Sequence, residues 1–230
     1  MIKRLLKITA VLLIIAALPL SLISCDRKYD EAEVKAAARE LIAASIPLND
    51  IYYGEGIRFL EYSERNVGVY WEADPAHLLE LGFSTIPELK TKTKEVFSIA
   101  HAERMFAGSL SGTFTPNGSS TLARYYQQYT EGGAPDYVIE PDYIMVYSEY
   151  ENMLKGDVTY DLDNITVLGA EGDIVYVSVN VSIVYEDKTQ NTSVKIGLFE
   201  EEAGWRLNSP SYVSYNEYLD IYDELQSDKK

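Results

Sequence analysis

The sequence predicts an α+β fold, in which N-terminal helices pack against a C-terminal four-strand antiparallel meander and a short terminal helix follows. Two patterns support this fold class. Apolar side chains recur at helical spacing in the first half of the chain, and they alternate with polar side chains between residues 158 and 207. Helices that come before a run of antiparallel strands are typical of α+β proteins, whereas helices and strands alternate along the chain of α/β proteins.

Three helices are predicted before the meander. The first covers residues 30–45, which are rich in alanine and place their apolar side chains on one stripe, and Pro47 ends it. The second begins at Thr85 with a capping box, which combines an N-cap hydroxyl with proline in the first turn and glutamate at position N3. Ser98 caps a third, shorter helix over residues 99–108.

Short strands and loops are expected around these helices. A strand is predicted at residues 67–71, a turn at residues 74–77, and a loop rich in glycine, serine and threonine at residues 110–120. Further strands are expected at residues 122–129 and 143–147, with a loop between them.

The clearest strand signal covers residues 174–186. Apolar and polar side chains alternate there almost without interruption, so that six apolar side chains share one face: Val175, Val177, Val179, Val181, Ile183 and Tyr185. A strand over residues 158–168 precedes it, and strands over residues 192–200 and 204–207 follow it after short polar turns. Ser214 begins another capping box, which opens the terminal helix.

The amino terminus predicts an export signal. Three basic side chains precede an apolar run over residues 8–20, which is too short to cross a bilayer comfortably. The segment ends at Leu22-Ile23-Ser24-Cys25, which resembles the bacterial lipobox. This resemblance implies that Cys25 carries a diacylglycerol and that cleavage falls directly before it. The alternative is an uncleaved membrane helix, but the short apolar run and Pro19 favour a processed signal.

We therefore expect three regions: a cleaved lipoprotein signal peptide over residues 1–24, a short tether over residues 25–29, and one α+β extracytoplasmic domain over residues 30–230. The lipid on Cys25 would hold this domain at the outer face of the cytoplasmic membrane. The chain has 20 basic and 36 acidic side chains, and residues 1–24 hold three basic ones and no acidic ones, so cleavage changes the net charge from −16 to −19. Such a charge excludes nucleic-acid binding and leaves membrane attachment to the lipid.

The mature domain contains no recognisable catalytic or metal-binding pattern. Its two histidines are His77, expected in a turn, and His101, expected on a short helix, and no Gly-x-Ser-x-Gly sequence surrounds a serine. Cys25 is the only cysteine, which excludes a zinc site built from several thiolates. The acidic run at residues 157–164 lacks the glycine and the distal glutamate of a calcium-binding loop, and residues 200–202 are expected to form a solvated hairpin turn. We expect a protein that is not an enzyme and has no cofactor and no metal.

Tyrosine is unusually abundant, with 19 residues against six phenylalanines. Its ring combines an apolar face with a polar hydroxyl and loses little side-chain entropy on binding, which makes it common in recognition surfaces. Aromatic residues cluster at residues 52–53, 70–71, 125–129 and 143–150. Five side chains from the first three clusters are candidate partner-binding residues: Tyr52, Tyr53, Trp71, Tyr125 and Tyr126. The alternative is that most of the tyrosines are half-buried residues of sheets and helices.

Several short stretches resemble the D,L-endopeptidase inhibitor (IseA-like) family of Gram-positive bacteria. They are spread over most of residues 30–213 and comprise Tyr52-Tyr53-Gly54, residues 86–90 and 93–98, His101-Ala102-Glu103 and Gly204-Trp205-Arg206-Leu207. The resemblance implies a protein that blocks, without a covalent bond, the active-site cleft of a peptidoglycan-cleaving cysteine hydrolase of NlpC/P60 type. The family is freely secreted, whereas this chain carries a lipoprotein signal.

A second function class stays open. The stretch Gly204-Trp205-Arg206-Leu207 also occurs in cystatin-like (NTF2-like) lipoproteins, which would bind a small ligand between a curved sheet and its helices. An inhibitor is expected to present aromatic side chains on an exposed loop or rim, whereas a ligand-binding protein lines an enclosed pocket with them. An enzyme is the third possibility.

The lipobox predicts the outcome of one substitution. Cys25→Ser removes the thiol that accepts the diacylglycerol, so we expect an unprocessed or soluble precursor without lipid label. Metabolic labelling with a fatty acid and separation of membranes from the soluble fraction measure the two effects. A Cys25→Ser protein that matures and partitions with membranes as the wild type does would show that the lipobox assignment is wrong.

Overall fold

The computed structural model describes residues 29–111, 113–114, 120–128, 143–150, 152, 154, 156–185 and 188–213. The predicted signal peptide, Cys25 and the terminal helix predicted from Ser214 lie outside these residues. Within them, the chain forms four helices, two larger antiparallel sheets and one two-stranded pair. The α+β class is confirmed.

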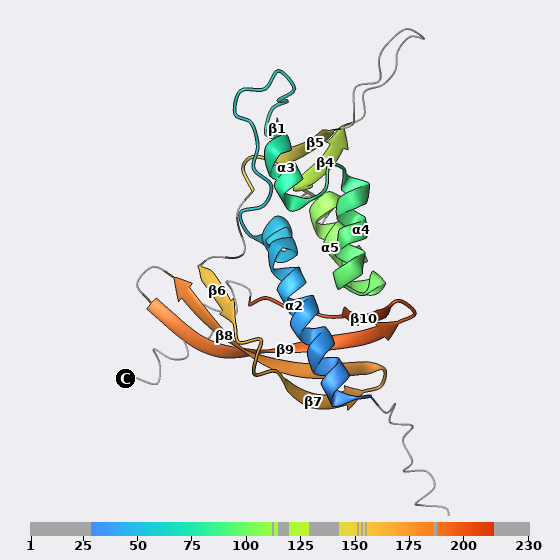
Figure 1. Ribbon diagram of the computed structural model, residues 1–230. Helices are drawn as coiled ribbons and strands as arrows, with labels where there is room; N and C mark the ends of the chain where they lie inside the picture. Colours follow the sequence, from blue (N-terminus) through green and yellow to red (C-terminus); the bar gives the residue numbers. More distant parts are fainter. Residues whose placement is uncertain are drawn as a thin grey trace, which may run out of the picture.

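One long helix, α2 (Glu31–Tyr53), reaches from one sheet to the other. Figure 1 shows its N-terminal part lying across the five-stranded sheet, and its C-terminal end beside the helices α4 (Ile86–Val96) and α5 (Ile99–Leu110) and the three-stranded sheet. The molecule is therefore elongated, with the five-stranded sheet at one end and the three-stranded sheet at the other (Figure 1).

The predicted N-caps of α4 and α5 are confirmed. Thr85 Oγ1 accepts a hydrogen bond from the backbone N–H of Glu88 at 3.3 Å. Ser98 Oγ accepts one from the backbone N–H of His101 at 3.2 Å. Each hydroxyl satisfies one of the N–H groups that a helix start leaves without a partner.

The turn predicted at residues 74–77 is wrong, because this segment begins a helix, α3 (Pro75–Leu81). The Asp74 carboxylate accepts a hydrogen bond from the backbone N–H of Ala76 at 2.9 Å. Pro75 follows at the first helical position, where its missing N–H costs nothing. His77 therefore lies on a helix.

The end predicted for the first helix is also wrong, because α2 continues through Pro47 to Tyr53. A proline inside a helix costs about 3 kcal/mol, since it lacks the N–H and crowds the preceding turn. The additional turns bury Leu48, Ile51 and Tyr52, none of them more than 6% exposed. Burial of a side chain of this size contributes about 1.5–3 kcal/mol, so the tertiary contacts outweigh the cost of the proline.

The five-stranded sheet contains β6 (Asp157–Tyr160), β7 (Thr166–Glu171), β8 (Ile174–Tyr185), β9 (Lys188–Glu201) and β10 (Gly204–Leu207). Its order is β10-β9-β8-β6, and β7 also pairs with β8. The consecutive strands β7 to β10 form the predicted four-strand antiparallel meander.

The single strand predicted over residues 158–168 is divided in two. Strands β6 and β7 pair with successive parts of β8, and a turn at residues 161–165 separates them. Asn164 Nδ2 donates hydrogen bonds to both carboxylate oxygens of Asp161, at 2.9 and 3.0 Å. A local contact between side chains of this kind favours a turn over a continuous strand.

The three-stranded sheet contains β1 (Tyr70–Glu72), β4 (Tyr125–Gln128) and β5 (Tyr143–Tyr147), in the order β1-β5-β4. The strand predicted at residues 143–147 is confirmed, and the one predicted at residues 122–129 is present over fewer residues. The loop predicted at residues 110–120 is interrupted by a two-stranded pair, β2 (Thr113–Phe114) with β3 (Ser120–Thr121), whose second strand extends one residue beyond it. Strand β1 begins at Tyr70 rather than at Val67, because Gly68 adopts a φ of +59° in a tight turn between them.

One hydrophobic core follows α2 from the five-stranded to the three-stranded sheet. The predicted apolar face of β8 lies in this core, and five of its residues are at most 4% exposed: Val175, Val177, Val179, Val181 and Ile183. Val34, Ala38 and Ile42 of α2 are 0% exposed in the same core. A sheet with one packed face and one solvated face explains the alternation in the sequence.

Two buried residues next to and within β4 hold the C-terminal end of α2. The hydroxyl of Tyr125 donates a hydrogen bond to the carbonyl of Ile51 at 2.6 Å and accepts one from the backbone N–H of Ile57 at 3.1 Å. Arg124 Nη2 donates to the carbonyl of Gly54 at 2.6 Å. These bonds satisfy carbonyls at the helix end, and the guanidinium lies at the negative end of the helix dipole.

Tyr125→Phe is expected to lower the free energy of unfolding by about 1–3 kcal/mol, because it leaves two buried backbone groups without their partner. Urea denaturation measures this as a lower midpoint at an unchanged slope. Tyr176→Phe is the control, since Tyr176 is a half-exposed residue of β8, and its effect is expected to stay within about 0.5 kcal/mol. Equal midpoints for Tyr125→Phe and the wild type would contradict the importance of this contact.

Candidate functional site

Two of the five predicted partner-binding residues lie inside the core. Tyr52 and Tyr125 are both 0% exposed. The hydroxyl of Tyr52 shares a hydrogen bond with Thr93 Oγ1 at 2.9 Å. Burial raises the pKa of both phenols, to about 12 for Tyr125. A partner has no access to either ring in this structure, and both tyrosines are buried more completely than the half-buried positions of the alternative interpretation.

The other three candidates, Tyr53, Trp71 and Tyr126, are half-buried and lie apart. The ring of Tyr53 packs on that of Tyr212 at a centroid distance of 4.6 Å, at the end of α2. Trp71 and Tyr126 point to opposite faces of the three-stranded sheet, because they pair with adjacent residues of β5. The five predicted residues therefore do not form one site.

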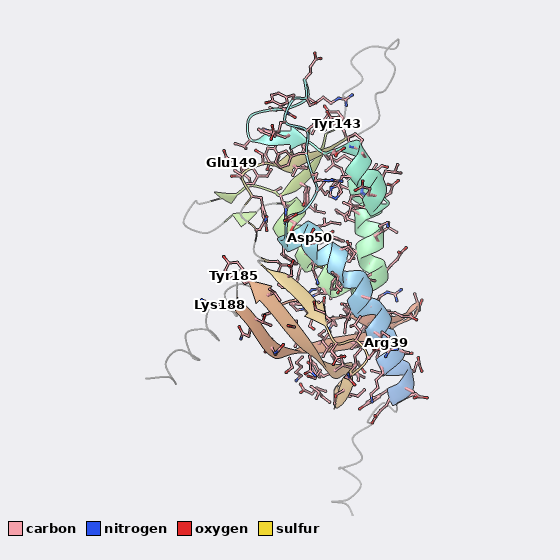
Figure 2. All side chains as sticks on the ribbon, turned by 60° about the vertical axis from the view of Figure 1, so that its left-hand side comes forward. Arg39, Asp50, Tyr143, Glu149, Tyr185 and Lys188 are labelled. Atoms are coloured by element: carbon pink, nitrogen blue, oxygen red, sulfur yellow. The ribbon has the colours of Figure 1, made fainter. Side chains whose placement is uncertain are left out.

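Four tyrosines gather on the face of the three-stranded sheet that includes Tyr126, which we call the tyrosine face: Tyr70, Tyr126, Tyr143 and Tyr147. The ring of Tyr70 meets that of Tyr126 edge-on at a centroid distance of 4.8 Å and lies 5.7 Å from that of Tyr147. All four side chains are half-exposed. Figure 2 shows Tyr143 at this end of the molecule, far from Arg39 on α2.

A loop over residues 60–69, the 60–69 loop, projects beyond this sheet (Figure 1). It carries Tyr62, whose side chain is 96% exposed, and Val67, which is 62% exposed. Hydrogen bonds from the backbone N–H of Leu60 to Glu72 and from that of Val67 to Tyr70, both 2.8 Å, join its two ends to β1. The loop therefore presents a tyrosine ring entirely to solvent.

A buried carboxylate holds the inside of the 60–69 loop. Glu72 on β1 is 6% exposed. Its Oε1 lies 2.5 Å from Arg65 Nη1 in an ion pair, and its Oε2 accepts a hydrogen bond from Ser63 Oγ. The guanidinium of Arg65 also lies 4.7 Å from the centre of the Tyr143 ring. These contacts tie the loop to the tyrosine face.

Asn66 fixes the backbone of the same loop. Its Nδ2 donates hydrogen bonds to the carbonyls of Leu60 and Glu61, at 2.9 and 3.2 Å. Its Oδ1 accepts one from the backbone N–H of Glu72 at 2.8 Å. A loop whose turns are already fixed loses little conformational entropy when it binds a partner.

Exposed carboxylates lie on the two segments next to the tyrosine face. Glu61 and Glu64 are exposed on the 60–69 loop, and Glu149 is exposed directly after β5 (Figure 2). The positive charge of Arg65 among them is paired with Glu72. The surface therefore combines aromatic rings with exposed carboxylates.

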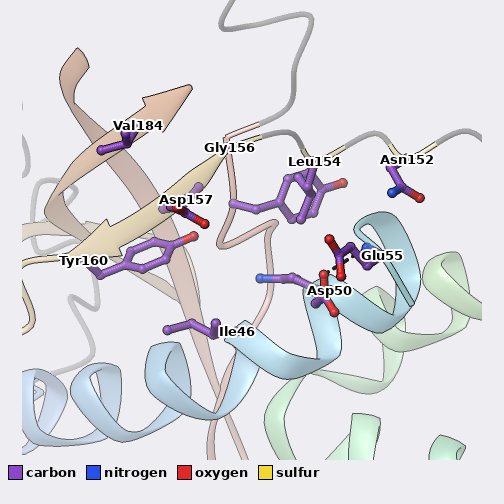
Figure 3. Close-up of a pocket in the computed structure, with 12 residues that line it drawn as sticks. Ile46, Asp50, Glu55, Asn152, Leu154, Gly156, Asp157, Tyr160 and Val184 are labelled. Carbon is purple, nitrogen blue, oxygen red and sulfur yellow. Dashed lines mark hydrogen bonds between the residues drawn. The ribbon is translucent and has the colours of Figure 1, made fainter. Parts of the chain in front are cut away.

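A concave region lies between α2 and the five-stranded sheet, and we call it the α2 cleft (Figure 3). Its volume is about 730 Å³, which lies within the range of small-molecule sites. The carboxylates among its lining residues are Asp50, Glu55 and Asp157, and the aliphatic side chains are Ile46, Leu154, Val158 and Val184. Asn49, Asn152, Gly156, Tyr160 and Tyr212 complete the described lining, which contains no basic residue.

The Nδ1 atoms of both histidines contact neighbouring groups of the fold. His77 Nδ1 accepts a hydrogen bond from the backbone N–H of Arg58 at 2.9 Å. His101 is 6% exposed, and its Nδ1 lies 3.1 Å from Arg104 Nη2. Burial, assisted by the charge of Arg104, lowers the pKa of His101 to about 4, so this imidazole is neutral near pH 7.

The part of the chain that the structure describes contains no group of three or more histidine, cysteine or acidic side chains placed to hold a metal ion. In the acidic run at residues 157–164, the Asp163 carboxylate pairs with Arg39 of α2 at 3.1 Å. Among the described residues, no helix is long and apolar enough to cross a membrane.

Tyr62 is the functional candidate that the sequence reasoning missed. A signal was available, because this tyrosine stands between glutamate and serine in a polar run, where a core residue is uncommon. Tyr70, Tyr143 and Tyr147 belong to the tyrosine-rich clusters, but only the strand register shows that they share one face with Tyr126.

Glu72→Ala is expected to loosen the 60–69 loop, because it removes the acceptor of Arg65 and Ser63. Hydrogen exchange is expected to become at least about tenfold faster at the backbone amide of Asn66. Glu64→Ala, which removes an exposed carboxylate from the same loop, is expected to leave this rate unchanged. An unchanged rate in Glu72→Ala as well would mean that the carboxylate does not hold the loop.

Neither a scan against protein-family models nor a search of curated proteins finds a match to this chain. The identity of any target enzyme therefore depends on the resemblance of the short sequence stretches to the IseA-like family, and the binding surface depends on the geometry of the chain.

Proposed function

We propose that this protein is a membrane-anchored extracytoplasmic lipoprotein that binds and inhibits a peptidoglycan D,L-endopeptidase, a cell-wall hydrolase of NlpC/P60 type. Binding is non-covalent, and the protein itself is not an enzyme. The lipid on Cys25 holds it at the outer face of the cytoplasmic membrane, where such hydrolases act.

The observation that carries this proposal is the 60–69 loop, with Tyr62 96% exposed beside the tyrosine face. A protein that blocks an enzyme cleft needs a projecting element that keeps its shape, because ordering a loose loop would weaken binding. The contacts of Glu72 and Asn66 supply this order before any partner arrives. Tyrosine is well suited as the anchor, since its large ring has few rotamers to lose.

The orientation of the molecule supports the same function. The tether would join the N-terminal end of α2, and the tyrosine face lies at the opposite end of the molecule (Figure 1). A helix of 23 residues is about 35 Å long, so the 60–69 loop would face the wall rather than the membrane.

Charge adds specificity for the partner. Glu61, Glu64 and Glu149 add negative charge beside the aromatic rings, on a mature chain of net charge −19. Such a surface attracts a partner whose cleft carries basic residues, both by electrostatic steering and by cation–π contacts with the rings.

The small-ligand alternative receives less support from the aromatic residues. The four rings of the tyrosine face lie on a half-exposed surface, whereas a ligand-binding protein would enclose its aromatic side chains in a pocket. Two tyrosines, Tyr160 and Tyr212, line the α2 cleft among carboxylates and aliphatic side chains.

Titration of the mature chain into peptidoglycan-digestion assays with several NlpC/P60 domains tests the proposal. We expect slower digestion at micromolar protein and a complex on gel filtration. Tyr62→Ala is expected to weaken inhibition at least about tenfold without lowering the unfolding midpoint, because the ring is fully exposed and its loss leaves no cavity.

Leu168→Ala is the matched control, since it removes a side chain that is 53% exposed on β7 of the distant sheet, and inhibition is expected to be unchanged. If no hydrolase is slowed and no complex forms, the proposed function is wrong. If the Tyr62→Ala variant inhibits the hydrolase as strongly as the wild type does, the 60–69 loop is not part of the binding surface.

A further inference from the structure

Strand β9 has a long edge that no neighbouring strand covers. On one side, β10 pairs only with its last residues, from Leu198 to Glu201 (Figure 1). On the other side, β8 pairs with the whole of β9, back to Lys188 at the end of the hairpin (Figure 2). Among the described residues, no strand therefore lies beside residues 189–195 of β9, an edge about 24 Å long.

The backbone groups of this edge point away from β8. Asn208 donates its backbone N–H to the carbonyl of Gly197 at 2.7 Å, and the N–H of Gly197 donates to Ser209 Oγ at 2.8 Å, so Gly197 faces the free side of β9. Backbone direction repeats every second residue in an antiparallel strand. In the described part of the chain, the same side presents N–H and C=O groups without a partner from four exposed residues: Thr189, Asn191, Ser193 and Lys195.

The edge lacks the features that usually prevent edge strands from pairing. Strand β9 contains no proline, and its pairing with β8 has no bulge. The side chains of the edge that face the core, Gln190, Thr192 and Val194, are uncharged. Lys195, at one end, is held by Glu171 at 3.3 Å. An unprotected edge of this length is a template for another strand.

A second copy of the same strand would satisfy every group of this edge. In the symmetric register, Thr192 would lie opposite Thr192 of the second copy. Asn191 would then pair with Ser193 of the second copy, and Thr189 in the same way with Lys195. Each of these pairs would exchange both backbone hydrogen bonds, so all the outward-facing N–H and C=O groups would gain a partner. No two like charges would face each other in this register.

Charge favours a second copy at this place. The mature chain has a net charge of −19, so two copies repel each other. Residues 188–199 of β9 contain no carboxylate, and contact through them joins the copies at a segment without negative charge. We infer that the protein forms a symmetric dimer, in which the edges of two β9 strands pair antiparallel and join the two five-stranded sheets into one. This inference is independent of the proposed inhibition.

Sedimentation velocity of residues 26–230, the mature chain without the lipidated cysteine, tests for the dimer. Pairing of strand edges buries little apolar surface, so we expect a dissociation constant between about 10 µM and 1 mM. Higher salt is expected to strengthen the dimer, because salt screens the repulsion between two copies of net charge −19.

A charge variant and its matched control locate the contact. Asn191→Asp/Ser193→Asp would place carboxylates directly opposite each other in the dimer, and we expect the dissociation constant to rise at least about tenfold. Asn180→Asp/Ser182→Asp introduces the same charges at the same residue types on β8, in the same rows of the sheet but one strand away from the edge. This control is expected to change the dissociation constant less than about threefold. Equal unfolding midpoints would show that both variants keep the fold.

Single cysteines test the register, since residues 26–230 contain no cysteine of their own. Thr192→Cys is expected to form a disulfide-linked dimer under mild oxidation, because opposite residues without mutual backbone bonds have Cα atoms about 4.5 Å apart. Gln190→Cys, on the same face of β9, is the control. Its two copies would lie about 14 Å apart along the strands, beyond the range of a disulfide, so no linkage is expected.

Three outcomes would overturn the inference. They are a protein that stays monomeric up to about 1 mM, a dimer that Asn191→Asp/Ser193→Asp leaves unchanged, and crosslinking of Gln190→Cys as efficient as that of Thr192→Cys. The first would leave the edge to an extended peptide of another protein, the second would place the dimer contact elsewhere, and the third would exclude this register. None of these results bears on hydrolase inhibition, which is measured with a different partner and at the 60–69 loop.

Discussion

The contact between the C-terminal end of α2 and β4 positions both candidate functional regions of this protein. Tyr125 and Arg124 bind the last carbonyls of the helix from a fully buried position. Gly56 adopts a φ of +80° beside them, and a Cβ at this position would collide with both side chains. Because α2 lies across the five-stranded sheet, this joint determines how the tyrosine face and the 60–69 loop stand relative to the rest of the molecule.

The same joint connects the two candidate sites. Asn49 and Asp50 lie in the last turns of α2 and line the cleft. Ile57, whose backbone N–H donates a hydrogen bond to the Tyr125 hydroxyl, lies shortly before the 60–69 loop in the sequence. The continuation of α2 beyond Pro47 is what brings Asn49 to the cleft. A helix that ended at residue 45 would lose the buried Leu48, Ile51 and Tyr52, and with them the contact with β4.

Local signals predicted the parts of the fold that depend on neighbouring residues. The alternation in β8 and the N-caps at Thr85 and Ser98 are of this kind, because periodicity and capping act within a few residues. The burial of Tyr125 and the tyrosine face depend instead on the pairing of β1 and β4 with β5, strands that are distant in sequence. Composition identified tyrosine as the notable residue, but it could not separate structural rings from exposed ones.

The ion pair between Glu72 and Arg65 is better explained as a means of fixing the conformation of the 60–69 loop than as a contribution to the free energy of unfolding. Removing a carboxylate from water costs several kcal/mol, and apolar side chains of similar volume often stabilise a fold as well as a buried ion pair does. An apolar pair, however, would not hold Ser63 Oγ and the loop backbone in fixed directions. Charged groups with directional hydrogen bonds select one loop conformation, and a single conformation is what an element that enters a rigid cleft requires. The position of this ion pair at the loop that carries the exposed Tyr62 therefore supports recognition by the 60–69 loop more strongly than the abundance of tyrosine does.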